Sequence, residues 1–294
     1  MTSSAPTDTS GVPWLILPTY NEAENIEAIV SAAADVLGDA TEGAFKILIV
    51  DDGSPDGTGE IADRLARERD QVEVLHRAEK NGIGPAYLAG FSHALDHGAG
   101  YVMEMDSDFS HDPADLARLL AATDRGHTAR PSPPGSSPPD CVPVPAGSAG
   151  SGADLALGSR YVPGGGVVDW GLLRRFISRG GSTYARWTLG LDVRDLTGGF
   201  KCFRREVLEA IHFDSVRSQG YAFQVELTYR AVRAGFRVVE VPIVFKDREL
   251  GQSKMSWRIA AEAMWLVPRL RFGRHRPPAS GARRPAQVDV TSGR

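Results

Sequence analysis

The chain has 294 residues, of which 42% are hydrophobic and 24% charged, and these values are ordinary for a soluble globular protein with a sizeable core. Its net charge of −4 provides no overall basic field, so a nucleic-acid partner is not expected. The two cysteines, Cys141 and Cys202, form neither a disulfide framework nor a zinc motif, and a reducing cytoplasm suits them best.

The N-terminus, residues 1–11, lacks the basic segment and apolar run of a signal peptide and is expected to be disordered. No stretch of about 18 uncharged apolar residues predicts a transmembrane helix. If the protein works on a membrane, we therefore expect it to work from the side.

Apolar runs rich in β-branched residues alternate with helical patterns from the start of the chain. The predicted strands are Val12–Pro18, Phe45–Val50, Val72–His76, Tyr101–Met105, Leu155–Ser159 and Val238–Phe245. The predicted helices are Asn25–Leu37, Thr58–Arg69, Gly84–His97 and Trp257–Leu270. Near-continuous apolar strands indicate a sheet covered on both faces. We therefore expect a single-domain α/β fold with a mostly parallel sheet flanked by helices.

One segment interrupts this alternation. Residues 126–152 are dominated by Pro, Gly and Ser, so we expect a disordered surface insertion that cannot bury apolar surface or hold a strand ladder. Cys141 lies in this segment. An amphipathic helix is expected over residues 255–272, and a disordered tail with a basic bias over residues 273–294.

Two aspartates, Asp106 and Asp108, follow the fourth predicted strand, and ligands of open α/β sheets collect at the carboxyl ends of strands. At positions i and i+2 of extended backbone, both side chains can face the same way. Two carboxylates with room for water suit Mg²⁺ or Mn²⁺ held jointly with the phosphates of a ligand. The alternative is a turn and helix cap before Pro113, with Asp112 the better cap residue.

A second acidic segment, Asp51–Ser54, follows the second predicted strand. It predicts either a ligand site or an Asx-type turn in which Gly53 and Gly57 adopt positive φ. Because both acidic segments lie at strand ends of the same sheet, the ligand site gains support over the turn alone.

Two other patterns are explained without a cofactor. The segment Asn81–Ala86 is no dinucleotide fingerprint, because it does not follow the first strand and Tyr87 stands where a third glycine belongs. His93 and His97 are four residues apart on a predicted helix, but no HExxH motif accompanies them. His97 is typical of a helix C-terminus.

The segment Leu172–Leu191 combines arginines with apolar and aromatic residues. Such an amphipathic stretch can lie on a membrane or hold an anionic head group. A core helix whose arginines extend past apolar surface to solvent is an equally weighted alternative.

Together, nine segments in order resemble the dolichol- or polyprenol-phosphate mannose synthases, which are family 2 glycosyltransferases with the GT-A fold. They are PTYNEAENI (18–26), DDGSPDGT (51–58), NGIGPAYLAGF (81–91), MDSDFSHDP (105–113), GSRYVPGG (158–165), SRGGSTYAR (178–186), DLTGGFKCF (195–203), GYAFQVE (220–226) and VPIVFKDRELGQSK (241–254). The resemblance covers residues 12–254, which it implies form one GT-A catalytic domain.

The resemblance implies roles for the matching residues. The nucleotide sugar would be held by Pro18, Tyr20, Glu22, Val50, Asp52, Asp106, Ser107, Asp108, Arg248 and Lys254. Mg²⁺ or Mn²⁺ would be held by Asp106, Asp108 and Ser110. The acceptor phosphate would face Arg160, Arg174 and Ser178. The catalytic set would be Asp106, Asp108, Arg160 and Arg248.

The implied activity is inverting, metal-dependent transfer of mannose from GDP-mannose to polyprenyl (dolichyl) phosphate, at the inner face of the cell membrane. A transferase that uses a UDP-sugar, and a non-catalytic nucleotide-sugar-binding scaffold, are the alternatives. The chain departs from the family at its Pro-rich insertion and at Glu104, where an apolar residue is usual, and we expect none of the C-terminal transmembrane helices that some relatives carry. Membrane contact would come from Leu172–Leu191, from Trp257–Phe272, from the basic tail or from a separate membrane-anchoring protein.

Overall fold

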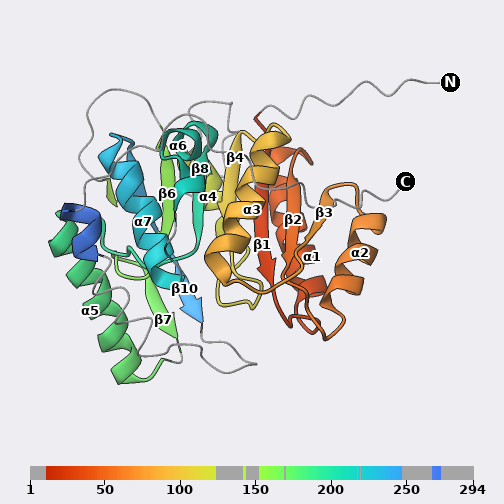
Figure 1. Ribbon diagram of the computed structural model, residues 1–294, viewed down its shortest axis with the longest axis horizontal. Helices are drawn as coiled ribbons and strands as arrows, with labels where there is room; N and C mark the ends of the chain where they lie inside the picture. Colours follow the sequence, from red (N-terminus) through yellow and green to blue (C-terminus); the bar gives the residue numbers. More distant parts are fainter. Residues whose placement is uncertain are drawn as a thin grey trace, which may run out of the picture.

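The computed structural model describes residues 11–123, 142–143, 152–168, 170–216, 218, 220–246 and 267–272. In this part of the chain, an eight-stranded sheet with the order β3-β2-β1-β4-β8-β6-β9-β5 lies between helices (Figure 1). Its strands are β1 Pro13–Thr19, β2 Lys46–Asp51, β3 Val72–His76, β4 Tyr101–Glu104, β5 Val142–Pro143, β6 Leu155–Ser159, β8 Lys201–Arg204 and β9 Val238–Pro242. A separate two-stranded sheet pairs β7 Gly166–Val168 with β10 Val244–Lys246.

The helices are α1 Ile26–Thr41, α2 Thr58–Glu68, α3 Ile83–Asp96, α4 Asp115–Thr123, α5 Leu172–Leu189, α6 Arg205–Ala210 and α7 Gly220–Arg233, with a 3₁₀ turn at Phe213–Ser215. The expected α/β fold is confirmed. The predicted strands Val72–His76 and Leu155–Ser159 have the predicted bounds, and the other predicted strands of the first half agree within one residue.

Strands β1, β2, β3 and β4 pair in parallel, as their apolar sequences predict. Strand β8 was not predicted, and it lies antiparallel between β4 and β6. Its four residues, KCFR, include two cations, so the apolar pattern of a buried strand is absent.

The predicted strand Val238–Phe245 is wrong as one element. It divides into β9, which is parallel to β6, and β10, which pairs with β7 outside the main sheet. The break comes at Ile243, whose N–H still donates to the main-chain O of Ser159 (3.0 Å) while its own main-chain O accepts the N–H of Gly166 in β7 (2.9 Å).

The expectation that residues 126–152 hold no ladder is wrong at two residues. Val142 and Pro143 form β5, which pairs antiparallel with β9 at the edge of the sheet. Proline is tolerated there because an edge strand needs ladder bonds on one side only. The rest of this insertion up to 151, residues 1–10 and residues 273–294 lie outside the described residues, as does most of the predicted helix Trp257–Leu270. Residues 267–272 are helical.

Alternating side chains of the strands form a core on each face of the sheet. Trp14 and Ile16 pack on the face that carries α3 and α7, and Leu15 and Leu17 pack on the face that carries α1, α2 and α4. Helix α3 lies close to β1 at Gly90, where an added Cβ would come within 2.4 Å of the Cγ2 atom of Ile16.

Two ionisable residues face each other in the middle of the sheet. Glu104 on β4 is the cross-strand partner of Lys201 on β8, and both are fully buried. Burial raises the pKa of Glu104 to about 7, although the charge of Lys201 opposes the shift. Burial lowers the pKa of Lys201 to about 8, and Glu104 opposes that shift in turn. The buried lysine therefore supplies the opposing charge for the unusual glutamate. Its hydrogen bonds go to Gln224, to the main-chain O (3.0 Å) and to Oε1 (2.5 Å).

Replacing Glu104 alone should destabilise the fold more than replacing both residues. The variant Glu104→Met leaves the Lys201 cation buried without its opposing carboxylate, so we expect a loss of about 3–5 kcal/mol in the free energy of unfolding. The double variant Glu104→Met/Lys201→Met removes both charges and should recover most of this loss. Urea unfolding of the parent, of Glu104→Met, of Lys201→Met and of the double variant measures both effects. Additive losses in the double variant would show that the two residues do not interact.

Candidate active site

The carboxyl ends of β1, β2 and β4 meet at one edge of the sheet. Thr19 pairs with Asp51 at the ends of β1 and β2. On the other side of β1, the N–H of Met105 reaches the main-chain O of Ile16 at 3.4 Å. The polar segments that follow these three strands are thus brought together, as the sequence predicts.

The loop after β1 is fixed to the loop after β2 by three hydrogen bonds. The backbone N–H groups of Asn21, Glu22 and Ala23 donate in turn to Ser54 Oγ (3.1 Å), Thr58 Oγ1 (2.9 Å) and Asp56 Oδ2 (3.1 Å). These bonds set the path of the backbone around Tyr20 and Glu22, and Asn21 has a positive φ of 60°. Gly53 and Gly57 also have positive φ. The N–H of Thr58 donates to Asp56 Oδ1 (3.1 Å), so an Asx-type turn exists and at the same time shapes the site.

Asp52 and Tyr20 each lie beside a cation from the segment after β3. Arg77 Nη1 is 2.5 Å from Asp52 Oδ1, and the ammonium of Lys80 lies 3.4 Å from the centre of the Tyr20 ring. Burial raises the pKa of Asp52, against the opposing effect of Arg77. Pro18 pairs with Val50 in the adjoining strands, so all five predicted nucleotide-binding residues of this half (Pro18, Tyr20, Glu22, Val50 and Asp52) lie at the same strand ends.

The loop that follows β4 carries the two predicted metal-binding aspartates. Ser107 Oγ donates to the main-chain O of Pro18 (2.9 Å), which ties this loop to β1. Ser110 donates to Asp108 Oδ1 from both its backbone N–H (3.0 Å) and its hydroxyl (2.5 Å). The hydroxyl of Tyr87, on α3, reaches Asp106 Oδ1 at 3.4 Å.

Negative charge accumulates around the Tyr87 hydroxyl. Its pKa is raised well above the ordinary value, first by burial and then by the carboxylates of Asp106, Glu104 and Asp108. The two aspartates therefore both act on one buried group. Such an accumulation of carboxylates favours a bound cation.

The donor set fits a hard divalent cation. Asp106 and Asp108 offer carboxylate oxygens and Ser110 a hydroxyl, which are ligands that Mg²⁺ and Mn²⁺ accept. Within the described ranges, no group of three or more His, Cys, Asp or Glu residues is placed to enclose a metal. A cation held here would thus take its remaining ligands from water or from the phosphates of a bound molecule.

Arg160 lies just after β6 and is held by a buried carboxylate. Its Nε and Nη2 donate to the two oxygens of Asp195, each at 2.7 Å, and the side chains of the pair are only 5% and 0% exposed. The carboxylate more than offsets burial, so the pKa of Arg160 is raised. Glu240 on β9 accepts the backbone N–H groups of Arg194 and Asp195, both at 2.9 Å, and so fixes the loop that carries Asp195.

An aromatic cluster connects Arg160 to the aspartate loop. The guanidinium of Arg160 lies 5.5 Å from the ring centre of Phe245 and 5.6 Å from that of Trp170. The His111 ring is 5.1 Å from the same Phe245 ring, and the N–H of Lys246 donates to the main-chain O of Ser110 (3.1 Å). Strand β10 therefore links the loop after β4, which carries Asp106 and Asp108, to Arg160.

The remaining predicted residues are placed in part. Ser178 on α5 accepts the hydroxyl of Tyr161 at 2.6 Å, which puts it next to Arg160 in space. Arg174 is a residue of α5, and Arg248 and Lys254 lie outside the described residues.

Two structural alternatives considered from the sequence are confirmed. Asp112 Oδ1 accepts the N–H of Ala114 (3.0 Å) at the start of α4, so Asp112 is a cap residue. His93 bonds Glu73 (2.9 Å) and stacks on His97, the residue that caps the end of α3. These histidines pack against Trp14, near the start of β1, and form no part of the site.

Sequence reasoning missed three contributors. Tyr87 lies in a matched motif and has no role assigned from the sequence, although a buried tyrosine hydroxyl needs a partner. Asp195 lies in a matched motif without an assigned role. Phe245 was taken as the end of a strand. None has a local signal that would reveal its partner.

The fold is shared with solved glycosyltransferases of low sequence identity. A structure of glucosyl-3-phosphoglycerate synthase from Mycobacterium tuberculosis in complex with phosphoglyceric acid matches 88% of this chain and 79% of its own, with a TM-score of 0.56 and 16% identity. A mannosyltransferase from Pyrobaculum calidifontis, in complex with GDP-Man and Mn²⁺, matches 90% of this chain and 65% of its own, with a TM-score of 0.52 and 18% identity. These likenesses confirm the GT-A fold.

Sequence comparison is more specific. The chain is 46% identical over 254 residues to the polyprenol monophosphomannose synthase of Mycolicibacterium smegmatis, covering 86% of this chain and 84% of that protein. It is 43% identical over 254 residues to the undecaprenyl-phosphate mannosyltransferase of Micrococcus luteus, covering 86% and 91%. The family model described as glycosyl transferase family 2 matches residues 14–131. The chain therefore belongs to glycosyltransferase family 2 and is a glycosyltransferase.

Proposed function

We propose that this enzyme transfers mannose from GDP-mannose to a polyprenyl phosphate, with inversion at the anomeric carbon. The observation that carries the proposal is that β10 links two parts of the site. Phe245 lies between His111, in the loop that follows β4 and carries Asp106 and Asp108, and the buried cation Arg160. One side of this contact suits a metal-bound diphosphate and the other suits a phosphate acceptor. The relatives named for mannosyl transfer to polyprenyl carriers support the choice of sugar and acceptor.

On the donor side, Asp106, Asp108 and Ser110 would hold Mg²⁺ or Mn²⁺. When bound, the metal would neutralise charge on the departing diphosphate. The nucleotide would lie between the loops after β1 and β2, held by Pro18, Tyr20, Glu22, Val50, Asp52 and Ser107. Arg248 and Lys254 would close over the phosphates. Fixed loop geometry keeps these groups in place before the donor arrives, so little reorganisation is needed on binding.

On the acceptor side, the attacking atom is a phosphate oxygen. The second pKa of a phosphate monoester is about 6, so the group is largely dianionic at neutral pH and needs no general base. Arg160, with Arg174 and Ser178, would hold this dianion. In-line attack on the face opposite the leaving GDP would convert an α-linked donor into a β-linked product.

A lipid acceptor requires a place at the membrane. Among the described helices, none combines the length and apolar character needed to cross a bilayer. We propose that the enzyme binds peripherally at the inner face of the cell membrane, either directly or through a separate membrane-anchoring protein.

A donor screen tests the proposed reaction. Purified enzyme, a short-chain polyprenyl phosphate and Mg²⁺ or Mn²⁺ should give polyprenyl-phosphate mannose from GDP-mannose and little product from GDP-glucose, UDP-glucose or UDP-N-acetylglucosamine. Faster transfer from a UDP-sugar would contradict GDP-mannose as the donor and make that UDP-sugar the proposed donor instead. Nucleotide binding without product from any donor would favour a non-catalytic scaffold.

Loss of one metal-binding carboxylate should abolish transfer without unfolding the protein. For Asp108→Ala we expect the rate to fall by at least about 10²-fold, because stabilisation of the leaving group is lost. The control is Asp112→Ala, in the same loop, which removes a helix cap worth about 1 kcal/mol but no proposed ligand. Product formation and thermal unfolding are measured for both. Near-normal transfer by Asp108→Ala would exclude the aspartate pair from the mechanism.

Asp195 should act through Arg160 rather than on the donor. The variant Asp195→Asn keeps the shape of the side chain but loses the charge and one of the two guanidinium contacts. We expect the KM for the acceptor to rise at least about tenfold while the KM for GDP-mannose stays near that of the parent enzyme, a loss of about 1.4 kcal/mol or more in acceptor binding. The control Asp192→Asn removes an exposed pair with Arg186, which contributes little. An equal effect on both KM values would contradict a role at the acceptor phosphate.

A further inference from the structure

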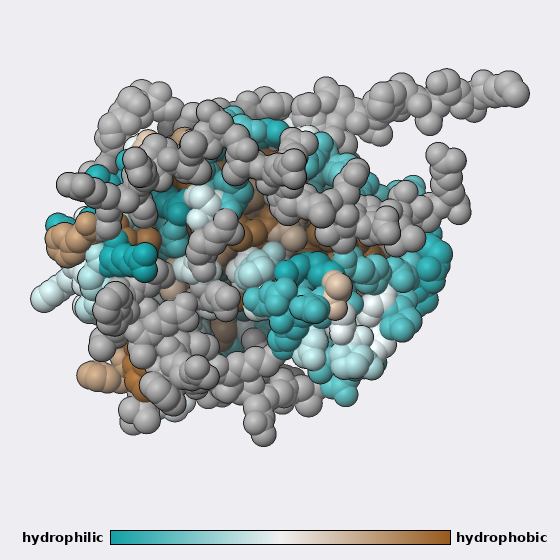
Figure 2. Space-filling view, viewed as in Figure 1, coloured by the Kyte–Doolittle hydropathy of each residue, from teal (hydrophilic) through white to brown (hydrophobic). Residues whose placement is uncertain are grey.

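The first turns of α5 have little apolar contact with the rest of the protein. Of the side chains described from 175 to 183, Ser182 alone is buried. Figure 2 shows hydrophobic side chains at the surface at both ends of α5, on the left of the view. The residues of this helix that pack in or against the core, Tyr184, Ala185 and Leu189, come later. Polar contacts therefore set the position of the earlier turns.

Two of these polar contacts lead to Arg160. The hydroxyl of Tyr161 donates to Ser178 Oγ at 2.6 Å, and one turn later Ser182 Oγ lies 3.2 Å from Thr197 Oγ1. Thr197 also accepts a hydrogen bond from Arg160 Nη2 (2.8 Å). Ser178 and Ser182 are four residues apart, so they share one face of the helix. This face is the one that contacts the surroundings of Arg160.

The direction of the Tyr161 hydrogen bond decides what Ser178 can do. A serine hydroxyl has one hydrogen to donate and two lone pairs with which to accept. Because Tyr161 donates, Ser178 keeps its own hydrogen for another acceptor, and no second partner of this hydroxyl is found in the part of the chain that the structure describes. Burial raises the pKa of Tyr161, so the phenol keeps its proton at neutral pH.

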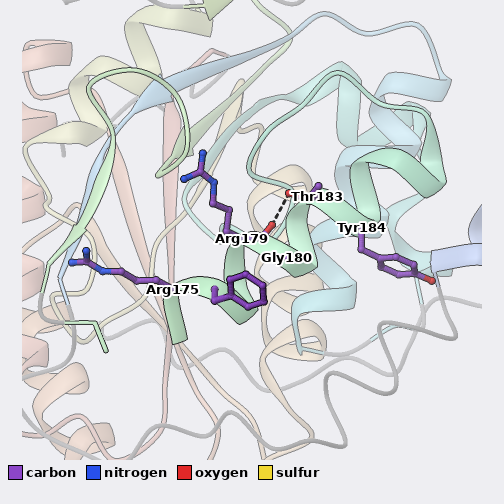
Figure 3. Close-up of a pocket in the computed structure, with 6 residues that line it drawn as sticks. Arg175, Arg179, Gly180, Thr183 and Tyr184 are labelled. Carbon is purple, nitrogen blue, oxygen red and sulfur yellow. Dashed lines mark hydrogen bonds between the residues drawn. The ribbon is translucent and has the colours of Figure 1, made fainter. Parts of the chain in front are cut away.

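A neighbouring hydroxyl on α5 behaves differently. Thr183 Oγ1 donates to the main-chain O of Arg179 (2.8 Å), the bond drawn as a dashed line in Figure 3. A hydroxyl bonded back to its own helix has no hydrogen left for a ligand. Arg175, in the same view, donates to the main-chain O of Val167 (2.9 Å), which ties these turns to β7 but brings no hydroxyl to the site. Ser178, by contrast, has a hydrogen to offer.

Arg160 also keeps donors for a ligand. Three of its five N–H groups are used, because Nε and Nη2 bind Asp195 and Nη2 also binds Thr197. The two N–H groups on Nη1 make no hydrogen bond within the described ranges. Tyr161 contacts both donors, since its ring centre lies 5.3 Å from the guanidinium of Arg160 and its hydroxyl bonds Ser178.

We propose that Tyr161 is a positioning residue, which holds the Ser178 hydroxyl beside Arg160 so that the two donate together to the phosphate of the acceptor. The inference rests on the proposed function and deepens it, because it names the residue that joins the two parts of the acceptor site. Tyr161 does not itself bind the phosphate, since its hydroxyl hydrogen is directed at Ser178. Without this bond, Ser178 would bond back to its own helix as Thr183 does, and the phosphate would lose a donor.

Kinetics with a short-chain acceptor test this role. Tyr161→Phe keeps the ring beside Arg160 but loses the hydrogen bond to Ser178. With GDP-mannose as donor, we expect the KM for geranyl phosphate to rise about three- to tenfold while the KM for GDP-mannose stays near that of the parent. The control Tyr101→Phe removes a phenol hydroxyl at the start of β4, the end remote from Asp106, and should leave both KM values unchanged.

A double-mutant cycle separates positioning from a general structural effect. Ser178→Ala removes the hydroxyl on which Tyr161 acts, so adding Tyr161→Phe to it should cause no further rise in the KM for geranyl phosphate. A structural defect would instead multiply with the loss of Ser178, and it would raise the KM for GDP-mannose as well. Multiplying effects, or a parent-like KM for geranyl phosphate in Tyr161→Phe, would overturn the proposal.

Calorimetric titration with geranyl phosphate in the absence of donor distinguishes the two hypotheses. A parent enzyme that neither binds geranyl phosphate nor transfers mannose to it would contradict the proposed function, and the role of Tyr161 with it. Binding and transfer by the parent, with the same affinity for geranyl phosphate in Tyr161→Phe, would leave the proposed function in place and overturn only the role of Tyr161.

Discussion

Carboxylates crowded at the carboxyl ends of the central strands are the constraint around which the first half of the site is built. Glu104, Asp106 and Asp108 all act on the buried hydroxyl of Tyr87, and like charges at such proximity repel. The fold accommodates them in two ways. Lys201 faces Glu104 from the neighbouring antiparallel strand, and the divalent cation that we propose would compensate the charge of the two aspartates. The inserted antiparallel strand β8 is thus part of the electrostatics of the site as well as of the sheet.

The parallel half of the fold and the position of the aspartates could be predicted from the sequence, because both depend on local patterns. Runs of Val, Ile and Leu identify buried strands, and the polar residues that end them must meet at one edge. The remaining features depend on contacts between distant segments. Strand β8 carries Lys201, whose counter-charge is almost a hundred residues away, and β10 follows β9 after one residue, Ile243, yet pairs with β7 in a different sheet.

The same limit on prediction from the sequence applies to Arg160, which we propose holds the acceptor phosphate. Arg160 could be selected from its motif, but its function depends on which carboxylate holds it. That carboxylate belongs to Asp195, and the loop that presents Asp195 is held by Glu240 on another strand. A guanidinium gripped at Nε and Nη2 has a fixed orientation and a permanent charge. A free surface arginine would have the charge without the orientation, and no spacing in the sequence distinguishes the two.

The arrangement of α5 has a kinetic consequence. Its Ser178 accepts a hydrogen bond from Tyr161, the residue next to Arg160, and the peripheral membrane binding proposed above would hold this reaction centre at a constant height above the lipid. An enzyme seated in this way meets a membrane-embedded substrate by diffusion in two dimensions. Its turnover would then follow the number of acceptor molecules per unit area of bilayer, and bulk concentration in the surrounding solution would govern only the supply of the water-soluble donor.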